Sequence, residues 1–145
     1  MATDNAIANK TYAFALRIIK AEKYLRETHQ EWVLSKQLLR CGTSIGANCR
    51  ESKNAQSTAD FISKFSIALK EADETDYWLN LLKDSGYIEQ NVFESMISDL
   101  DEIGKLLTSI IKTNKKKFET ENKKKNNPSK DNTETEDPTS PPSNP

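Results

Sequence analysis

Side chains able to carry enzyme chemistry are few and scattered in this sequence. His29 is the only histidine, so one chain can build neither a histidine-based catalytic triad nor a histidine metal cluster. Metal sites built from carboxylates in helical bundles need Glu-x-x-His on two helices, and the sequence lacks this motif. We therefore expect a protein that is not an enzyme, with no catalytic residue, no metal and no cofactor.

Two other clusters resemble functional motifs only at first sight. The acidic residues between Glu71 and Asp76 fall around a helix rather than on one inward face. Asp76 alone projects near the predicted core, where we expect it to pair with an arginine of another helix. The segment from Gly42 to Gly46 lies within a predicted helix and lacks a following Lys-Ser or Lys-Thr, so it matches no phosphate-binding loop.

Four polar residues follow one edge of the predicted second helix, namely Arg40, Ser44, Asn48 and Glu51. Arg40 and Glu51 lie about 16 Å apart along the helix axis, so they cannot pair with each other. Each must reach another helix, another subunit or a ligand. A structural seam of hydrogen bonds explains the four residues most simply. The alternative is that Arg40 or Arg50 contacts nucleic-acid phosphates.

Lysines dominate the end of the last predicted helix and the residues after it: Lys112, Lys115, Lys116, Lys117, Lys123, Lys124 and Lys125. Only Glu119 and Glu121 oppose them. Such lysines either complement the helix dipole and aid solubility, or make non-specific, salt-sensitive contacts with phosphates. Residues 4–114 carry 14 Lys and Arg against 16 Asp and Glu, so the basic body typical of nucleic-acid binding is absent.

Apolar residues spaced three and four apart predict four helices, at about residues 4–28, 33–54, 57–86 and 91–114. Asp4 is the expected cap of the first helix. Ser57 and Asp60 form a capping-box pattern for the third, which Gly86 ends in a left-handed conformation. No segment alternates as a strand does, and short connections make sequential helices antiparallel neighbours. We expect an all-α, antiparallel up-down-up-down four-helix bundle over residues 1–114.

Two glycines and two cysteines lie on the second helix. Gly42 and Gly46 each cost a helix about 1 kcal/mol relative to alanine, so we expect them where another backbone comes close. Cys41 and Cys49 lie on its apolar side about 12 Å apart, too far to bridge to each other. We expect both to act as small hydrophobic residues, with an intersubunit disulfide as the alternative.

The last residues cannot contribute to a core. Phe118 is the only aromatic or aliphatic side chain from Lys115 onward, so residues 115–145 are expected to form a disordered tail. No run of about 18 apolar residues predicts a membrane span, and the first residues lack the pattern of a secretory signal. We expect a cytoplasmic protein.

Three apolar residues of the third helix, Ile67, Trp78 and Leu81, lie away from its core-facing stripe. A large exposed apolar patch usually marks an interface, and tryptophan is a favoured anchor of interfaces. We therefore expect these residues to mediate self-association.

The sequence resembles a family of small bacterial four-helix-bundle proteins at the motif Arg40-x-x-x-Ser44-Ile45-x-x-Asn48, which Glu51 follows. These proteins are encoded in intervening sequences of 23S ribosomal RNA genes. Their relatives include the accessory variability proteins of diversity-generating retroelements. The likeness covers nearly all of residues 5–114 and includes Asp60, Phe61, Ile67, Ala68, Glu71 and Gly86-Tyr87-Ile88.

The resemblance implies a ring-shaped homopentamer that associates with nucleic acid and catalyses no reaction. In the retroelement branch the ring binds nucleic acid and a reverse transcriptase through basic residues, so the implied partners are RNA or DNA and a reverse transcriptase. Two departures, Cys49 and Ser52, look like conservative packing changes. No binding residue of the family maps onto this chain.

We interpret the chain as a homo-oligomeric accessory protein that binds RNA or DNA without sequence specificity. The candidate contacts are Arg40, Arg50, Lys112, Lys115, Lys116 and Lys117. The alternative is a protein-interaction scaffold that binds no nucleic acid.

Overall fold

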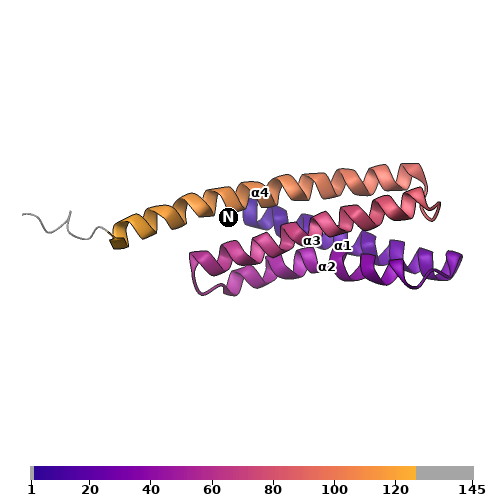
Figure 1. The fold of residues 1–145 in the computed structure, drawn as a ribbon, viewed down its shortest axis with the longest axis horizontal. Coiled ribbons are helices and arrows are strands. Elements are labelled where there is room, and N and C mark those ends of the chain that lie inside the picture. The colour runs from indigo at the N-terminus through magenta and orange to yellow at the C-terminus, as the bar shows by residue number, and fades with distance from the viewer. Residues whose placement is uncertain (1, 127–145) are drawn as a thin grey trace, which may run out of the picture.

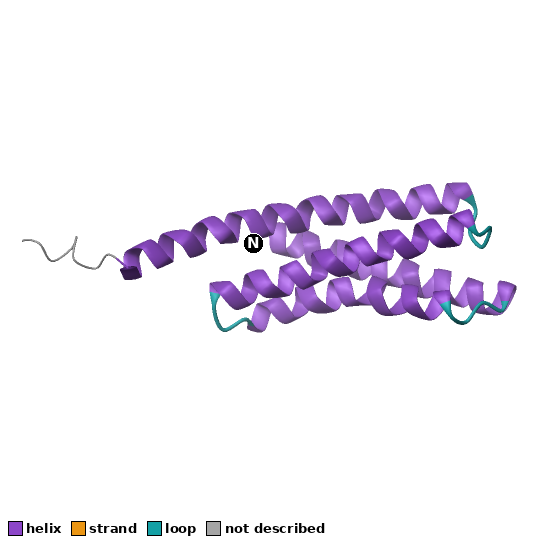
Figure 2. Ribbon diagram, viewed as in Figure 1, coloured by secondary structure: helices purple, strands orange, loops and turns teal. Residues whose placement is uncertain are grey.

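The computed structural model describes residues 2–126, with side chains from residue 6 onward. Its α-helices are α1 (Ala2–His29), α2 (Leu34–Glu51), α3 (Thr58–Asp84) and α4 (Gln90–Asn126), with a short 3₁₀ helix, η1 (Ser52–Asn54), after α2. The α2–α3 connection lies at one end of the bundle and the other two connections lie at the opposite end (Figure 1, Figure 2). The predicted up-down-up-down bundle is therefore confirmed. No helix within residues 2–126 has both the length and the apolar character that a membrane span requires.

The core consists of the stripes that the apolar spacing predicts. Side chains buried between the helices include Phe14 and Ile18 of α1, Ile45 of α2, Phe65 of α3 and Leu107 of α4. Four hydroxyl residues among those described are buried as well, and Ser52 is the one of them that donates to the carbonyl three residues earlier. The hydroxyl groups of Thr11, Ser35 and Thr75 each donate to the carbonyl four residues earlier, at 2.7 Å. Because these hydroxyls are satisfied within their own chain segment, they can lie in the core without a partner helix.

Glycines allow α1 and α2 to pack closely. A Cβ atom placed on Gly42 would lie 2.7–2.9 Å from the Ile18 side chain, and one on Gly46 would lie 3.3 Å from Thr11. Ile18 and Thr11 are themselves buried, so neither can swing into solvent. The expected approach of another backbone is confirmed at Gly46, where the Thr11 carbonyl oxygen would lie 3.4 Å from such a Cβ, whereas the nearest atoms at Gly42 belong to the Ile18 side chain. The other helical glycine, Gly104 of α4, has no neighbouring atom within 4 Å of such a Cβ among the described residues.

The ends of α3 match the sequence prediction. The Ser57 hydroxyl accepts a hydrogen bond from the backbone N–H of Asp60 at 3.0 Å, and the Asp60 carboxylate accepts from the backbone N–H of Gln56 at 3.3 Å. At the other end Gly86 has a φ of +83°, and Tyr87 N–H donates to the Leu82 carbonyl at 2.8 Å. This is the left-handed glycine cap that the sequence predicts.

The beginnings of the first two helices differ from the prediction. The first helix already begins at Ala2, so Asp4 lies inside it and is not its cap. The cap of α2 is Glu31, which the sequence analysis did not identify. One carboxylate oxygen accepts from Leu34 N–H at 2.9 Å and the other from Ser35 N–H at 2.7 Å. A carboxylate at this position satisfies free N–H groups and interacts favourably with the helix dipole.

The last helix is longer than predicted. It continues to Asn126, twelve residues past the expected end of the bundle at residue 114, and extends beyond the neighbouring ends of α2 and α3 (Figure 1). Residues 115–126 are therefore helical and do not belong to a disordered tail. Within them Glu121 accepts a hydrogen bond from the Thr58 hydroxyl at 3.1 Å, which connects this segment to the start of α3. The predicted tail after residue 126 lies outside the described residues.

Both cysteines are free and buried, as expected of small hydrophobic residues. Burial raises the pKa of the Cys49 thiol to about 12 and also raises the pKa of Cys41. Neither sulfur is accessible at the surface of this chain, so an intersubunit disulfide would require the core to open.

The Gly42 packing predicts opposite outcomes for two glycine substitutions. Gly42→Ala should lower the free energy of unfolding by about 1 kcal/mol, since overpacking costs about 1–3 kcal/mol and helix propensity returns about 1. Gly104→Ala should raise it by up to about 1 kcal/mol because its site has room. Urea unfolding monitored by circular dichroism measures both. Equal stability of the two variants would contradict the packing argument.

The Glu31 cap predicts a pH-dependent loss of stability. Burial alone would raise the pKa of Glu31, but hydrogen bonds from the backbone N–H groups of Leu34, Ser35 and Val33 lower it below its usual value near 4.5. The carboxylate therefore stabilises the fold fully above that value, and the contribution disappears as the pH falls through the lowered pKa. Glu31→Gln should cost about 1 kcal/mol at neutral pH and progressively less in acid.

The control for this measurement is Glu27→Gln, an exposed carboxylate in the last turn of α1. A negative charge near a helix C-terminus opposes the dipole, so this substitution should leave stability unchanged or slightly increased. If Glu31→Gln costs the same at pH 3 as at pH 7, the charged cap is not what stabilises α2.

Candidate nucleic-acid interface

Arg40, the first candidate for phosphate contact, is already paired within the chain. Its guanidinium group lies 3.5 Å from the Glu71 carboxylate and also contacts Glu74, both on α3. Glu74 in turn accepts a hydrogen bond from the Trp78 indole N–H at 3.2 Å. Two carboxylates offset the charge of this arginine, so it is a poor ligand for a phosphate.

Of the four polar residues along the edge of α2, only the first and the last, Arg40 and Glu51, reach α3. At the far end the Glu51 carboxylate lies 3.3 Å from the Lys64 ammonium group of α3. Between the ends, Ser44 donates to the Arg40 carbonyl at 2.6 Å and Asn48 donates to the Ser44 carbonyl at 2.8 Å. These two residues therefore bond within their own helix and do not reach a neighbour.

Asp76 has a different partner from the one predicted. It accepts a hydrogen bond from Asn80, one turn later on α3, at 2.9 Å. No arginine lies within salt-bridge distance of it among the residues whose side chains are described. The prediction of an interhelical ion pair is therefore wrong, because Asp76 lines a hollow between α3 and α4, whereas the four arginines lie on α1 and α2.

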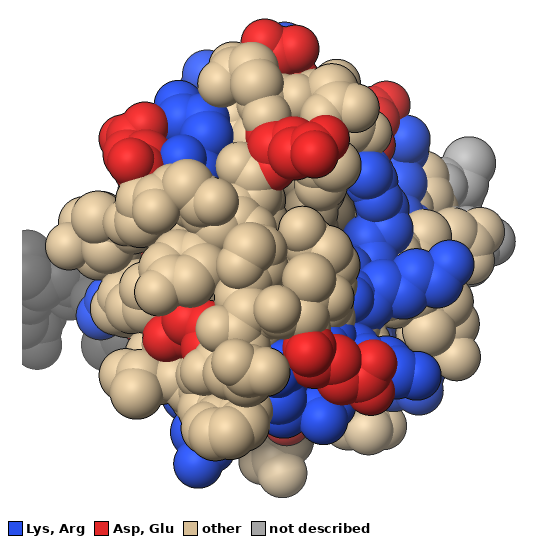
Figure 3. All heavy atoms as spheres, turned by 90° about the vertical axis from the view of Figure 1, so that its right-hand side faces the viewer, with Lys and Arg blue, Asp and Glu red and all other residues tan. Residues whose placement is uncertain are grey.

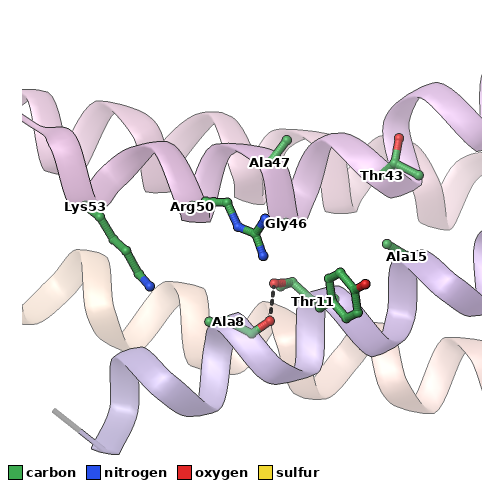
Figure 4. Close-up of a pocket in the computed structure, with 9 residues that line it drawn as sticks. Ala8, Thr11, Ala15, Thr43, Gly46, Ala47, Arg50 and Lys53 are labelled. Atoms are coloured by element: carbon green, nitrogen blue, oxygen red, sulfur yellow. Dashed lines mark hydrogen bonds between the residues drawn. The ribbon is translucent and has the colours of Figure 1, made fainter.

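Arg50 lies at the rim of a cavity of about 170 Å³ between α1 and α2, which we call the α1–α2 groove (Figure 4). Most of its lining is small, and the full set is Ala8, Thr11, Tyr12, Ala15, Thr43, Gly46, Ala47, Arg50 and Lys53. Arg50 and Lys53 both extend toward α1, and the Arg50 guanidinium lies 6.0 Å from the centre of the Tyr12 ring. The groove thus combines two cations, an aromatic ring and a floor of small residues.

Arg50 also differs from the other arginines in its pairing. Arg17 contacts Asp99, Arg26 contacts Glu22 and Arg40 contacts two glutamates. Across the described side chains, no carboxylate lies within 4.0 Å of the charged groups of Arg50 or Lys53. Sequence analysis identified Arg50 but missed Lys53 and Tyr12. The available signal was helical spacing, since Gly46, Arg50 and Lys53 follow one another at steps of four and three.

The lysines near the end of α4 occupy two different environments. Lys112 lines a hollow of about 620 Å³ between α3 and α4 together with Asp73, Asp76 and Asp101. Residues 115–126, the lysine extension, hold six lysines against two glutamates, and all six lysines are exposed. Because adjacent helical residues point about 100° apart, these lysines face several sides of the helix.

The predicted self-association residues are less exposed than expected. Ile67 is 40% exposed, whereas Trp78 and Leu81 are half-buried and Trp78 packs against the core. A more exposed apolar set lies on α1, at Tyr12 (58%), Leu16 (48%) and Ile19 (46%). We call these residues the α1 stripe. Their spacing of four and three places them on one face of the helix.

Apolar residues also cover the end of the bundle that carries the α1–α2 and α3–α4 connections. Exposed side chains there include Tyr24, Trp32, Val33 and Val92. Figure 3 views this end directly, with uncharged residues over its middle and Lys and Arg along one side. The lysine extension lies at the opposite end of the molecule (Figure 1), so the two ends differ in chemical character.

Comparison with known proteins places the chain in one family. Residues 3–109 match the 23S rRNA-intervening sequence protein family. A crystal structure described as a protein with unknown function from the S23 ribosomal protein family, from Bacteroides thetaiotaomicron, is 55% identical with a TM-score of 0.75. The match covers 76% of this chain and 98% of that one. No curated protein matches the sequence. The chain belongs to the 23S rRNA-intervening sequence protein family.

Proposed function

We propose that this protein is a non-catalytic, homo-oligomeric accessory protein that binds RNA or DNA without reading its sequence. The observation that carries the proposal is the lysine extension, six exposed lysines on a helix that extends beyond its neighbours (Figure 1). Lysine ammonium groups contact phosphates as point charges and carry no information about base sequence. The name of the family, which refers to intervening sequences of 23S rRNA, agrees with an RNA-associated role.

The charge distribution limits how strong such binding can be. The chain as a whole has a formal net charge of −1, so no general attraction to nucleic acid supports the local contacts. Arg40 is offset by Glu71 and Glu74, and Lys112 lies beside aspartates. Arg50, Lys115, Lys116 and Lys117 are therefore the stronger candidates from the original set. We expect affinity that is modest per chain and steeply dependent on salt.

Self-association is the second part of the proposal. The α1 stripe exposes three large apolar side chains on one face, more than a lone surface residue would explain. We propose that copies pack through Leu16 and Ile19 of this stripe, which leaves Tyr12 accessible beside the α1–α2 groove, and the resemblance noted from the sequence favours a pentameric ring. Ile67 of the originally predicted face remains a candidate contact because it is exposed, while Trp78 and Leu81 contribute less.

A pure protein-interaction scaffold is the competing function. The exposed apolar residues at the end of the bundle, Trp32 and Val33 among them, favour it because they offer apolar surface for a protein partner. On this alternative the lysine extension only keeps the assembly in solution, and a protein partner such as a reverse transcriptase would bind the apolar surfaces.

The nucleic-acid part predicts a charge-dependent loss of binding. Replacing the six lysines of the lysine extension by glutamine should abolish most binding to a labelled single-stranded RNA at low salt. Each lost phosphate contact should also lower the slope of log K against log salt by about 0.7. A chain ending at Asn114 should behave in the same way. Fluorescence anisotropy over a salt titration measures both quantities.

Matched controls separate this effect from a change of fold. Replacing Glu119 and Glu121 by glutamine removes charge of the opposite sign from the same segment, so it should tighten binding. Helix content of all variants is compared by circular dichroism. If the unaltered protein binds neither RNA nor DNA at low salt, the scaffold function replaces the nucleic-acid function.

The self-association part predicts which substitutions dissociate the assembly. Leu16→Glu combined with Ile19→Glu should convert an oligomer to monomers, because two buried carboxylates would lie unpaired in the interface. Val92→Glu, at a similarly exposed apolar site on α4, is the control and should leave the assembly intact. Analytical ultracentrifugation gives the masses. A wild-type chain that sediments as a monomer would contradict the proposal, and dissociation by Ile67→Glu alone would move the interface to α3.

A further inference from the structure

We infer that the α1–α2 groove is a phosphodiester-binding site for single-stranded nucleic acid, with Arg50 and Lys53 holding the phosphate and Tyr12 stacking on an adjacent base. The inference rests on the proposed function and gives it a defined location, separate from the lysine extension. Its basis is the juxtaposition of two cations that have no carboxylate partner among the described side chains, an exposed ring and a small cavity (Figure 4).

The size of the groove favours a phosphate group. A cavity of about 170 Å³ is too small for a drug-sized ligand, for which pockets are typically about 300–1,000 Å³. The lining includes Ala8, Gly46 and Ala47, which are so small that Arg50, Lys53 and Tyr12 are the main features of the groove. A phosphodiester can therefore enter while the rest of the strand stays outside, where Tyr12 is 58% exposed.

The hydrogen-bond donors of the groove come from its rim. The Thr11 and Thr43 hydroxyls each donate to a carbonyl of their own helix, at 2.7 Å from Ile7 and Leu39 respectively. These two hydroxyl groups are thus already hydrogen-bonded to the backbone. The guanidinium of Arg50 offers a planar pair of N–H groups that suits two phosphate oxygens, and the Lys53 ammonium adds a second positive charge.

An aromatic ring beside two cations is typical of sites for single strands. Proteins that bind single-stranded nucleic acid without sequence preference place bases on aromatic rings and track the backbone with positive charge. Tyr12 lies on the helix that faces Arg50, and its ring centre is 6.0 Å from the guanidinium carbon. An apolar ligand would leave both cations without a partner.

The first test removes the two charges. Arg50→Gln with Lys53→Gln is compared with Lys20→Gln with Lys70→Gln, which removes two exposed lysines on other faces of α1 and α3. Binding of a labelled single-stranded RNA to the full chain is measured by anisotropy across salt concentrations. The groove variant should lower the slope of log K against log salt by about 1.4, and the control variant should lower it by much less.

The second test adds a charge without removing a contact. Ala47 is exposed at the groove, so Ala47→Glu places a carboxylate there and Ala47→Gln serves as its uncharged match. The glutamate variant should bind RNA about tenfold more weakly than the glutamine variant at low salt, and the difference should shrink as salt is added. Tyr12→Ala should weaken binding by at least about fivefold through lost stacking.

Competition identifies the ligand class. Inorganic phosphate alone should displace the RNA only at concentrations far above those of a short unlabelled RNA, and a poly-glutamate peptide should displace it poorly. If phosphate or the acidic peptide competes as well as RNA does, the groove is a general anion site and the inference is wrong. Equal binding by the groove and control variants would also overturn it while leaving the proposed function intact. An absence of any binding by the wild-type chain would reject both.

Discussion

The close approach of α1 and α2 at Gly42 and Gly46 determines what the rest of the molecule presents. With no side chains at these positions, Ile18 and Thr11 fill the space directly against the α2 backbone. Small residues also make up most of the lining between these two helices, so a groove forms there instead of a flat surface. Arg50 and Lys53 stand at its rim because they continue the helical face that Gly46 begins. The contact between α1 and α2 thus also forms the candidate site.

Pairing of charges decides which basic residues remain available for a ligand. Three of the four arginines contact carboxylates, and each of these pairs is partly exposed, so its contribution to stability is small. The larger effect of this pairing is on ligand binding, since a guanidinium group that already faces a carboxylate attracts a phosphate only weakly. In a chain with nearly balanced charge, the groove and the lysine extension each bring together basic residues that no described carboxylate pairs with. Local imbalance therefore matters more here than net charge.

Most of the fold was predictable from the sequence because burial and helical periodicity impose the same spacing. Phe14, Ile45, Phe65 and Leu107 lie in the core where their spacing places them. The end of α4 was not predictable in this way. A lysine-rich segment cannot build a core, but a helix that is already formed extends at little cost, and lysine and glutamate favour helix. The composition of residues 115–126 therefore excluded their packing into the core, but it did not exclude a helix.

The candidate site was predictable only in part, since helical position does not reveal tertiary pairing. Arg40 and Arg50 look alike in the sequence, and only the location of Glu71 and Glu74 on α3 separates the paired arginine from the unpaired one. Trp78 was misjudged for a related reason. Its long side chain turns toward the core while its N–H group reaches Glu74, so an off-stripe position does not mean exposure. The Glu31 cap was missed because its carboxylate reaches forward from a loop to the helix.

The two ends of the molecule also differ in chemical character. One end carries the lysine extension and the other carries exposed apolar side chains (Figure 1, Figure 3). If copies pack side by side in the same orientation, as a closed ring requires, every lysine extension lies on one face of the ring. Contacts too weak to hold a strand singly would then act together, because binding at one copy raises the effective concentration of the strand at the next. Avidity would then determine the affinity of such a ring. The distance that the ring covers along a bound strand would determine the shortest nucleic acid that it retains.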